Sequence, residues 1–236
     1  MKSVAIMQPT FLPWIGYFAL IDRVDEFIFL DNVQFDKRSW QQRNKIKTAN
    51  GDIWLSVAVS TKGKRDQIIK QTEILYEGDK SPLDKIEKSI EFNYSKAPFY
   101  EHYASDVFSF LRNRPKYISD LNQDLIKWAC EKLNIKTPFI KASDLDVKGE
   151  KEILLLDICQ VLSATSYVSP PGSKTYLAET DAFNKAKIDV MYHEYIHPEY
   201  TQLYHDFLPY MCILDLLFNE GPASGDIMRQ GMIKRS

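Results

Sequence analysis

Short apolar runs alternate with helical periodicity at the start of the chain. The run Val4–Met7 stops at Gln8-Pro9, and apolar positions then recur at helical spacing from Trp14 to Ile21. A second apolar run, Phe27–Leu30, stops at Asp31-Asn32. Two short strands without polar alternation, separated by one helix, are typical of a buried parallel β-α-β unit. The pattern therefore predicts strand, helix and strand in this order.

The middle of the chain has a different pattern. Residues 54–59 form a strand-like run, and a charged turn follows at 62–66. The composition of residues 72–76 predicts another strand, which would pair with the first. From Ser81 the periodicity becomes helical, with Ser81-Pro82 typical of a helix start and with apolar positions at helical spacing between Leu121 and Leu133. We expect a mainly helical insertion at approximately 81–135.

Alternation of strands and helices resumes after this segment. Strands are expected at 138–140, 167–168 and 188–192, and helices at 150–162 and 173–187, with a last helix from Asp215 that ends at Gly221. No repeat or linker interrupts the chain. The prediction is a single α/β domain over residues 1–236, with a Rossmann-like parallel sheet of the HUP or nucleotidyltransferase type and the helical insertion within it.

Composition narrows the chemistry of any site. The chain has 30 basic and 32 acidic side chains, a net charge of −2, and only 4 His, 3 Cys and 9 Gly, against 4 Trp, 13 Tyr and 13 Phe. This charge balance gives no reason to expect nucleic acid or an anionic membrane as partner. Three widely spaced cysteines, a start too short in apolar residues for a signal peptide, and no long uncharged run lead us to expect a cytoplasmic protein without a membrane span.

The segment from Asp31 to Lys47 is the densest in polar and aromatic residues. Between Asp36 and Lys47 it holds five basic residues and one acidic residue, a local charge of +4. If Leu30 ends a parallel strand, these residues emerge where open α/β sheets bind ligands. Arginine forks and lysine charges suit phosphate, and an indole offers a face to a base or a sugar. A solvated basic loop is the alternative. The candidate substrate-binding residues are Gln34, Lys37, Arg38, Ser39, Trp40, Arg43, Asn44 and Lys45.

The segment that leads from the first strand into the first helix resembles another type of site. Nucleotidyltransferases with a HIGH motif carry two histidines here, which stabilise charge on phosphates. In this chain Trp14-Ile15-Gly16-Tyr17 occupies that slot and both histidines are absent, which argues against adenylate formation by that mechanism. Gln8, Trp14 and Tyr17 are candidate substrate-binding residues, and an ordinary core stripe is the alternative.

A serine- and glycine-containing turn follows the strand expected near Val168. Gly172 permits close approach of a ligand, and Ser173 is placed to cap a helix whose first amides would favour an anion. Ser169, Gly172 and Ser173 are therefore candidate substrate-binding residues. A capped turn without a ligand fits equally well.

Three of the four histidines lie in residues 193–205. His193 and His197 flank Glu194 at the spacing of a metalloprotease helix, but Pro198 disfavours helical geometry at His197, so no metal is predicted. His197 is a candidate general base, with a purely structural role as the alternative. The three cysteines lie in apolar surroundings, where an inert thiol is expected. No tightly bound cofactor is predicted.

Several of these stretches together resemble the WbqC-like protein family. They are A-I-M-Q-P-T-F-L-P-W-I-G-Y-F at 5–18, F-L-D-N-V-Q-F-D-K-R-S-W-Q-Q-R-N-K-I at 29–46, S-P-P-G at 169–172, Y-T-Q at 200–202, F-L-P at 207–209, and I-L-D-L-L-F-N-E-G at 213–221. The resemblance covers nearly the whole chain, and its motifs include Tyr200, Gln202, Asp215 and Asn219, which are further candidate substrate-binding residues. Asp215 and Asn219 are one helical turn apart, a spacing that fits a shared site or a solvent-exposed face. One departure is Gln41-Gln42 before Arg43, where the family usually has Asn before the Arg.

The resemblance implies a role in surface-polysaccharide (O-antigen) biosynthesis, because members are associated with such gene clusters and are described as candidate glycine transferases. The leading hypothesis is a transferase that moves an acyl or aminoacyl group to the amine of a nucleotide-linked amino sugar, with Asp31 or His197 as proton acceptor. The donor is open, an acyl-carrier protein being one candidate, and so is the oligomeric state. The alternatives are a nucleotide-binding or carboxylate-activating protein on a HIGH-type scaffold, or a non-catalytic scaffold of polysaccharide assembly.

Overall fold

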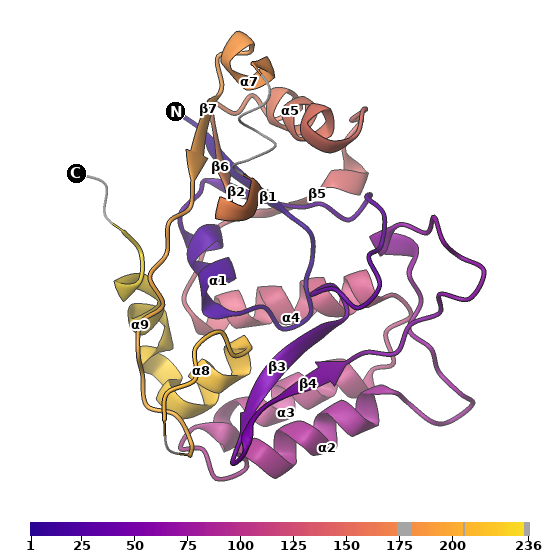
Figure 1. Ribbon diagram of the computed structural model, residues 1–236, viewed down its shortest axis with the longest axis vertical. Coiled ribbons are helices and arrows are strands. Elements are labelled where there is room, and N and C mark those ends of the chain that lie inside the picture. The colour runs from indigo at the N-terminus through magenta and orange to yellow at the C-terminus, as the bar shows by residue number, and fades with distance from the viewer. Residues whose placement is uncertain (174–180, 205, 234–236) are drawn as a thin grey trace.

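A five-stranded parallel sheet organises the chain in the computed structural model, which describes residues 1–173, 181–204 and 206–233 (Figure 1). The strands are β1 (Ser3–Met7), β2 (Glu26–Phe29), β5 (Phe139–Lys141), β6 (Ser166–Ser169) and β7 (Asp189–Tyr192). Their order across the sheet is β5-β2-β1-β6-β7. All four pairings are parallel. The expected Rossmann-like α/β fold is therefore confirmed.

The strand order reverses at β1, and this determines where a ligand can enter. From β1 the chain proceeds to β2 and β5 on one side, and then crosses to β6 and β7 on the other. Val4 of β1 pairs with both Glu26 of β2 and Tyr167 of β6. The connections leave β1 and β6 in opposite directions, so a crevice opens between their carboxyl ends.

Both faces of the sheet are covered, which explains why its strands are apolar without alternation. On one face Val4, Ile6 and Ile28 share a buried cluster with residues of α5 (Lys151–Val161) and α7 (Ala182–Lys185). On the other face lie α1 (Ile15–Asp22) and α4 (Ile118–Lys132) (Figure 1). There the Tyr17 ring of α1 meets the Phe27 ring of β2 at 5.5 Å between centroids.

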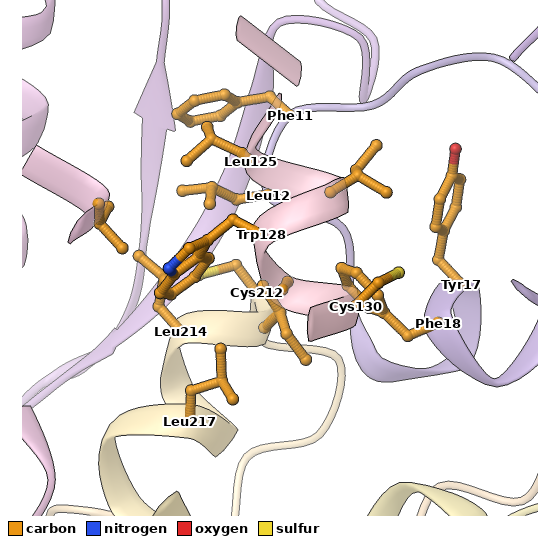
Figure 2. Packing of buried hydrophobic residues seen from close by; sticks show 14 of the residues in the cluster. Phe11, Leu12, Tyr17, Phe18, Leu125, Trp128, Cys130, Cys212, Leu214 and Leu217 are labelled. Atoms are coloured by element: carbon orange, nitrogen blue, oxygen red, sulfur yellow. The ribbon is translucent and has the colours of Figure 1, made fainter. Parts of the chain in front are cut away.

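The larger core lies below the sheet, around α4. Figure 2 shows Leu125 and Trp128 of this helix between Phe11 and Leu12 on one side and residues of α8 (Ile213–Glu220) on the other, with Cys130 on the side that faces Phe18 of α1. The remaining helices there are α2 (Leu83–Tyr94), α3 (Tyr100–Arg112) and α9 (Ser224–Gln230). Short 3₁₀ turns are found at Ile69–Gln71, Ala142–Asp144, Pro171–Ser173 and Gly221–Ala223.

Three helices thus occupy residues 83–132, as the periodicity after Ser81 indicates. Their roles differ, because α4 covers the sheet whereas α2 and α3 pack farther away, near a β-hairpin (Figure 1). The division of the chain into one domain with an insertion stays a prediction. Helix α8 ends at Glu220, and Gly221 follows with φ +54°, so the expected glycine stop is confirmed.

The basic segment corrects the sequence interpretation, because its second half is not a loop. Arg43–Thr48 forms β3, which pairs antiparallel with β4 (Gly51–Ser56). The sequence signal was the Asn50-Gly51 turn, where Gly51 has φ +108°. The expected strand at 72–76 is also wrong, since only isolated bridges such as Val59–Ile74 occur there. Of the helix expected at 173–187, residues 174–180 lie outside the described residues.

Candidate functional site

A cavity of about 1120 Å³ opens at the crevice between β1 and β6. Its walls come from the carboxyl ends of β1, β2 and β6, from the segment after β2, and from the start of α5. The lining residues are Ile6, Met7, Gln8, Thr10, Leu30, Asn32, Val33, Gln34, Asp36, Ser39, Trp40, Gln41, Ile68, Gly149, Glu150, Lys151, Glu152, Leu154, Leu155, Tyr167 and Pro170. Gln8, Gln34, Ser39 and Trp40 are thus the sequence-predicted site residues that the fold brings into one cavity.

A chain of hydrogen bonds organises the polar wall of this cavity. The Gln41 side-chain Nε2 donates to Gln8 Oε1 at 2.9 Å, and Gln41 Oε1 accepts from the Asp36 backbone amide at 2.9 Å. The Ser39 hydroxyl donates to the Asp36 carbonyl at 2.6 Å. Gln41 is only 2% exposed. The two segments that carry most of the predicted residues are therefore joined side chain to side chain, through a glutamine that sequence reasoning did not select.

Two buried asparagines fasten the backbone of the same wall. Asn122, on α4, donates from Nδ2 to the carbonyls of Pro9 and Gln41, at 3.0 and 2.8 Å. Asn44 donates in the same way to the carbonyls of Phe11 and Leu12. Asn44, predicted to bind substrate, thus lies behind the wall with its amide engaged by the backbone.

Further bonds complete this fastening. The Tyr17 hydroxyl donates to the Gln8 carbonyl at 3.0 Å, and the Phe11 amide donates to the Trp40 carbonyl at 2.9 Å. Tyr17 is 5% exposed and packs within the core. Tyr17 does not line the cavity, and its hydroxyl holds the backbone at Gln8, so its predicted contact with substrate stays a prediction.

The indole of Trp40 belongs both to the cavity wall and to a stack on the hairpin. Its ring lies 5.4 Å from that of Trp54 on β4. The Arg43 guanidinium lies 4.3 Å and the Lys45 ammonium 5.1 Å from the Trp54 ring centroid, and Lys45 also pairs with Asp52 at 2.6 Å. Two of the predicted phosphate-binding cations are therefore placed on the hairpin, outside the cavity lining.

The charges inside the cavity are mainly negative. Asp36, Glu150 and Glu152 line it, against Lys151 alone. The Asp36 carboxylate makes no hydrogen bond or ion pair within the described ranges. Lys37 and Arg38 are exposed beside it without lining the cavity. The local charge of +4 is present in the sequence, but none of its five cations lines the cavity.

The two residues predicted to accept a proton lie outside the lining. Both carboxylate oxygens of Asp31 accept hydrogen bonds from Ser143, one from its amide at 3.0 Å and one from its hydroxyl at 2.9 Å. His197 Nδ1 is 2.8 Å from the Pro198 carbonyl, and its Nε2 accepts from the Tyr210 amide at 3.2 Å. Burial lowers the pKa of His197, so its neutral form is favoured.

Trp14 closes the place where a HIGH motif would meet phosphate. Its ring carbons occupy the space directly over Gly16, where any Cβ would collide with them. The ring also stacks on His197, with centroids 5.9 Å apart, and meets the edge of Tyr210 at 5.2 Å. The first turn of α1 is thus covered by an aromatic cluster, and within the described ranges Trp14 makes no ring contact or hydrogen bond with a residue that lines the cavity.

The serine cluster after β6 is satisfied internally. The hydroxyls of Ser169 and Ser173 share a short hydrogen bond, Ser169 also lies 3.2 Å from the Tyr167 hydroxyl, and Ser173 donates to the Pro170 carbonyl at 2.7 Å. Both serines are buried, whereas Gly172 is exposed. Tyr167 and Pro170 line the cavity, so this cluster forms the support for one of its walls.

The C-terminal candidates form a separate buried network. Asp215 is fully buried and accepts hydrogen bonds from the hydroxyls of Tyr94 and Tyr200, each at 2.8 Å, and from Gln202 Nε2 at 2.6 Å. Burial raises the pKa of Asp215, which these donors and the charge of Lys47 oppose. Lys47 Nζ donates to Gln202 Oε1 at 3.0 Å. The predicted residues Tyr200, Gln202 and Asp215 are thus brought together, but apart from the cavity.

Asn219 extends this network along the last helices. Its Nδ2 donates to the Asp215 carbonyl at 2.7 Å, and its Oδ1 accepts from the Leu203 amide at 3.0 Å. Both polar ends are therefore used to fix the segment that follows Tyr200. The network has the bonding of a structural element, and whether any member contacts substrate stays a prediction.

The three cysteine thiols are buried, and burial makes them hard to ionise. Burial raises the thiol pKa of Cys159 and of Cys212 to about 12, and that of Cys130 still further. Within the described ranges, no group of three or more His, Cys, Asp or Glu side chains has a geometry that could hold a metal ion. The same part of the chain contains no helix long and apolar enough to cross a membrane.

With this geometry in place, the comparison with known proteins identifies the family. The model of the WbqC-like protein family matches residues 8–227. The chain belongs to this family. A relative from Mycobacterium tuberculosis, named "Uncharacterized protein Rv1507c", is 38% identical over 232 residues, which are 97% of this chain and 98% of the relative. No solved structure matches the chain.

The WbqC-like motifs therefore form two separate groups in the structure of this protein. The first two, at 5–18 and 29–46, meet at the cavity through Gln8, Gln41 and Asn44. Those at 200–202 and 213–221 meet in the Asp215 network. The cavity residues that sequence reasoning missed, above all Gln41, Asp36 and Asn32, lie inside the second motif, where their polar character was the available signal.

Proposed function

We propose that the protein transfers an acyl or aminoacyl group, with glycyl as one candidate, to the amine of a nucleotide-linked amino sugar bound in the cavity. The observation that carries this proposal is the lining itself: amide side chains, one indole and unpaired carboxylates at the switch point of a Rossmann-like sheet. Ligands of such sheets bind at this place. Membership in a family associated with surface-polysaccharide biosynthesis supports the same substrate class.

The lining suits an amino sugar for specific chemical reasons. Amide side chains donate and accept hydrogen bonds at once, as sugar hydroxyls do, and Gln8, Asn32 and Gln34 offer such groups to the cavity. Trp40 offers an apolar ring face to the C–H groups of a sugar. The carboxylates of Asp36 and Glu152 attract the ammonium form of the amine. A purely phosphate-binding site would have the opposite charge.

The chemical step needs a free amine and a positioned carbonyl. The amine nitrogen attacks the carbonyl carbon of a thioester donor, the new C–N bond forms, and the C–S bond breaks with the thiol as leaving group. One ammonium proton passes to a carboxylate before attack, and a second leaves the nitrogen and protonates the departing thiolate. We assign the first acceptor to Asp36, because Asp31 is engaged by Ser143 and His197 by the backbone.

The experiment is a mass-based transfer assay. The full chain is incubated with nucleotide-linked amino sugars and with thioester donors, carried by coenzyme A or by an acyl-carrier protein, and the sugar nucleotide is expected to gain the mass of one acyl or aminoacyl group. Asp36→Asn should lower turnover by about 100-fold, since a positioned proton acceptor contributes about that much. Asp189→Asn, at the amino end of β7, is the matched control and should leave turnover unchanged. No product and no sugar-nucleotide binding across the panel would overturn the proposal.

The role of a HIGH-type nucleotide activator receives less support from the geometry. Trp14 covers the first turn of α1, where phosphates would have to bind. Pyrophosphate release from ATP on addition of glycine or another acid would nevertheless favour that alternative over transfer from a thioester. A scaffold without catalysis predicts that Arg38→Ala and Arg43→Ala change no small-molecule binding.

A further inference from the structure

Two basic stretches that are separate in the sequence lie together beside the cavity. Gln34, in the cavity wall, donates from Nε2 to the Arg65 carbonyl at 3.1 Å. Its backbone also forms a bridge with Ile68, and the neighbouring Phe35 amide donates to the Gln67 carbonyl at 2.9 Å. The charged turn at 62–66 is therefore held against the segment that contains Lys37 and Arg38.

The cations of these two stretches are exposed and largely unpaired. Lys37, Arg38, Lys62 and Arg65 are exposed and form no ion pair within the described ranges, whereas Lys64 pairs with Glu73 at 3.0 Å. The Arg38 backbone amide donates to Gln42 Oε1 at 3.0 Å, which fixes the chain at its φ of +64°. None of the four lines the cavity. We call these four residues the cationic rim.

The cavity lining has the opposite charge. It contains three carboxylates and one lysine, of which Asp36, Glu150 and Lys151 are exposed and Glu152 is half-buried, and its other polar groups are mostly neutral amides and hydroxyls. Asn32 Oδ1 is buried there and accepts no hydrogen bond from any described residue. A buried acceptor of this kind gains most from a donor on a ligand, such as a hydroxyl or an ammonium. A diphosphate offers only acceptors and negative charge.

The cavity is large enough that volume alone would admit either end of a sugar nucleotide. Its volume of about 1120 Å³ is slightly above the range typical of ligand pockets. The charges therefore decide the direction of binding. A diphosphate is repelled by the carboxylates inside and attracted by the arginines and lysines outside.

We propose that the sugar of a nucleotide-linked amino sugar binds inside the cavity, against Trp40 and Asn32, while its diphosphate stays outside on the cationic rim. This inference rests on the proposed function for its ligand class and adds the direction of binding. The amine then lies among Asp36 and Glu152, and the nucleotide base extends away from the sheet. Recognition of the sugar and of the nucleotide is divided between two sets of residues.

Saturation-transfer NMR on the full chain with UDP-glucosamine, and with the GDP- and dTDP-linked amino sugars, tests this direction. The sugar-ring protons should receive the strongest saturation and the base protons the weakest. Trp40→Ala should lower the saturation of the sugar protons relative to the base protons.

The rim is tested by titration calorimetry at two salt concentrations. The double variant Arg38→Ala with Arg65→Ala should bind UDP-glucosamine and UDP about tenfold more weakly at low salt, with a reduced dependence on salt, and should keep the sugar-first saturation pattern. Lys136→Ala, an exposed cation beyond the opposite end of β5, is the matched control and should change neither value.

The outcomes separate the two proposals. Strong saturation of the base with a weakly saturated sugar would overturn the direction of binding, even if the mass assay detects transfer. Sugar-first binding without any mass gain would overturn transfer and leave the direction standing. Absence of binding by every sugar nucleotide in the panel would overturn both.

Discussion

The side-chain amide of Gln41 donates a hydrogen bond to the side-chain oxygen of Gln8 across 2.9 Å. Gln8 directly follows the central strand β1 and Gln41 precedes the β-hairpin, so this contact joins two segments of the chain at the wall of the cavity. The side-chain nitrogen of Gln8 donates no hydrogen bond within the described ranges, so this donor is available to a ligand in the cavity. The orientation of one glutamine is thereby set by the other.

Removal of this contact should affect both ligand binding and stability. Gln41→Ala leaves the Asp36 amide and the Gln8 oxygen without their partner, so we expect a loss of about 1–3 kcal/mol in the free energy of unfolding. UDP-glucosamine binding should weaken about tenfold. Gln123→Ala is the matched control, because Gln123 is also a buried glutamine with a side-chain hydrogen bond, to the Ser119 hydroxyl at 2.9 Å, but does not line the cavity. Urea unfolding and calorimetry measure the two effects; equal loss of binding in both variants would contradict the assignment.

Asn122 should matter to the cavity without contacting its ligand. Asn122→Asp keeps the shape of the side chain but removes the amide donors to the Pro9 and Gln41 carbonyls. Because a carboxylate next to two carbonyls is also repelled, we expect a loss of about 3 kcal/mol or more in the free energy of unfolding. Asn184→Asp, on the short helix α7, provides the comparison and should lie within about 0.5 kcal/mol of the parent. If Asn122→Asp were as stable as the parent protein, the stabilising role of these two hydrogen bonds would be refuted.

The buried Asp215 network should be more sensitive to one hydroxyl than to another. Tyr94 and Tyr100 both pack against Phe218, at 5.5 and 5.4 Å between ring centroids. Of the two hydroxyls, only that of Tyr94 is hydrogen-bonded within the described ranges, donating to Asp215 and accepting from the Lys47 amide. Tyr94→Phe should therefore cost about 1–3 kcal/mol of unfolding free energy, and Tyr100→Phe less than about 0.5 kcal/mol. Similar values for the two would show that the network contributes little.

His193 should make the protein less stable as the pH falls. Burial and the positive charge of Arg23 lower its pKa to about 4, and a weak contact with the Gly16 backbone offsets only part of this change. An unfolded histidine titrates near pH 6.5, so between about pH 6.5 and 4 the unfolded chain binds a proton that the native protein does not. Within this window each pH unit should lower the free energy of unfolding by about 1.4 kcal/mol.

The comparison of variants isolates this contribution. His193→Phe keeps a ring against Tyr195, 5.8 Å away in the native protein, and should show a shallower loss of stability between pH 6.5 and 4.5. The exposed His102, changed to Gln, is the control and should keep the parent slope. His197 contributes with the same sign in all three proteins and cancels in the comparison. Identical slopes for the parent and His193→Phe would contradict the assignment.

Much of the fold was predictable because burial on both faces leaves a strong signal. Val4–Met7 and Phe27–Phe29 are apolar without alternation, and Gly221 ends the last long helix, as expected. The hairpin was missed for a physical reason: its outward residues Arg43 and Lys45 are charged, so the segment resembles a solvated loop. Only the pairing with residues 51–56 shows that Asn44 and Ile46 alternate with them toward the interior.

The position of the cavity was predictable, but the residues that line it were not. Polar residues after β1 and β2 indicated the edge of the sheet at which the cavity opens, and Gln8, Gln34, Ser39 and Trp40 line it. The direction of each side chain was not available from the sequence. Arg43 and Lys45 were therefore expected to bind phosphate, whereas in the structure they contact Trp54. Asp31 was expected to act as a base, whereas both its carboxylate oxygens accept hydrogen bonds from Ser143.

The fastening of the loop after β1 has a consequence for binding free energy. Gln8 and the residues behind it are held by Gln41, Asn44, Asn122 and Tyr17 before any ligand arrives. The conformational entropy of this wall is thus lost during folding and need not be lost again on association. The wall is preorganised, and a ligand that fits it should bind with an entropy cost that falls mainly on the ligand itself.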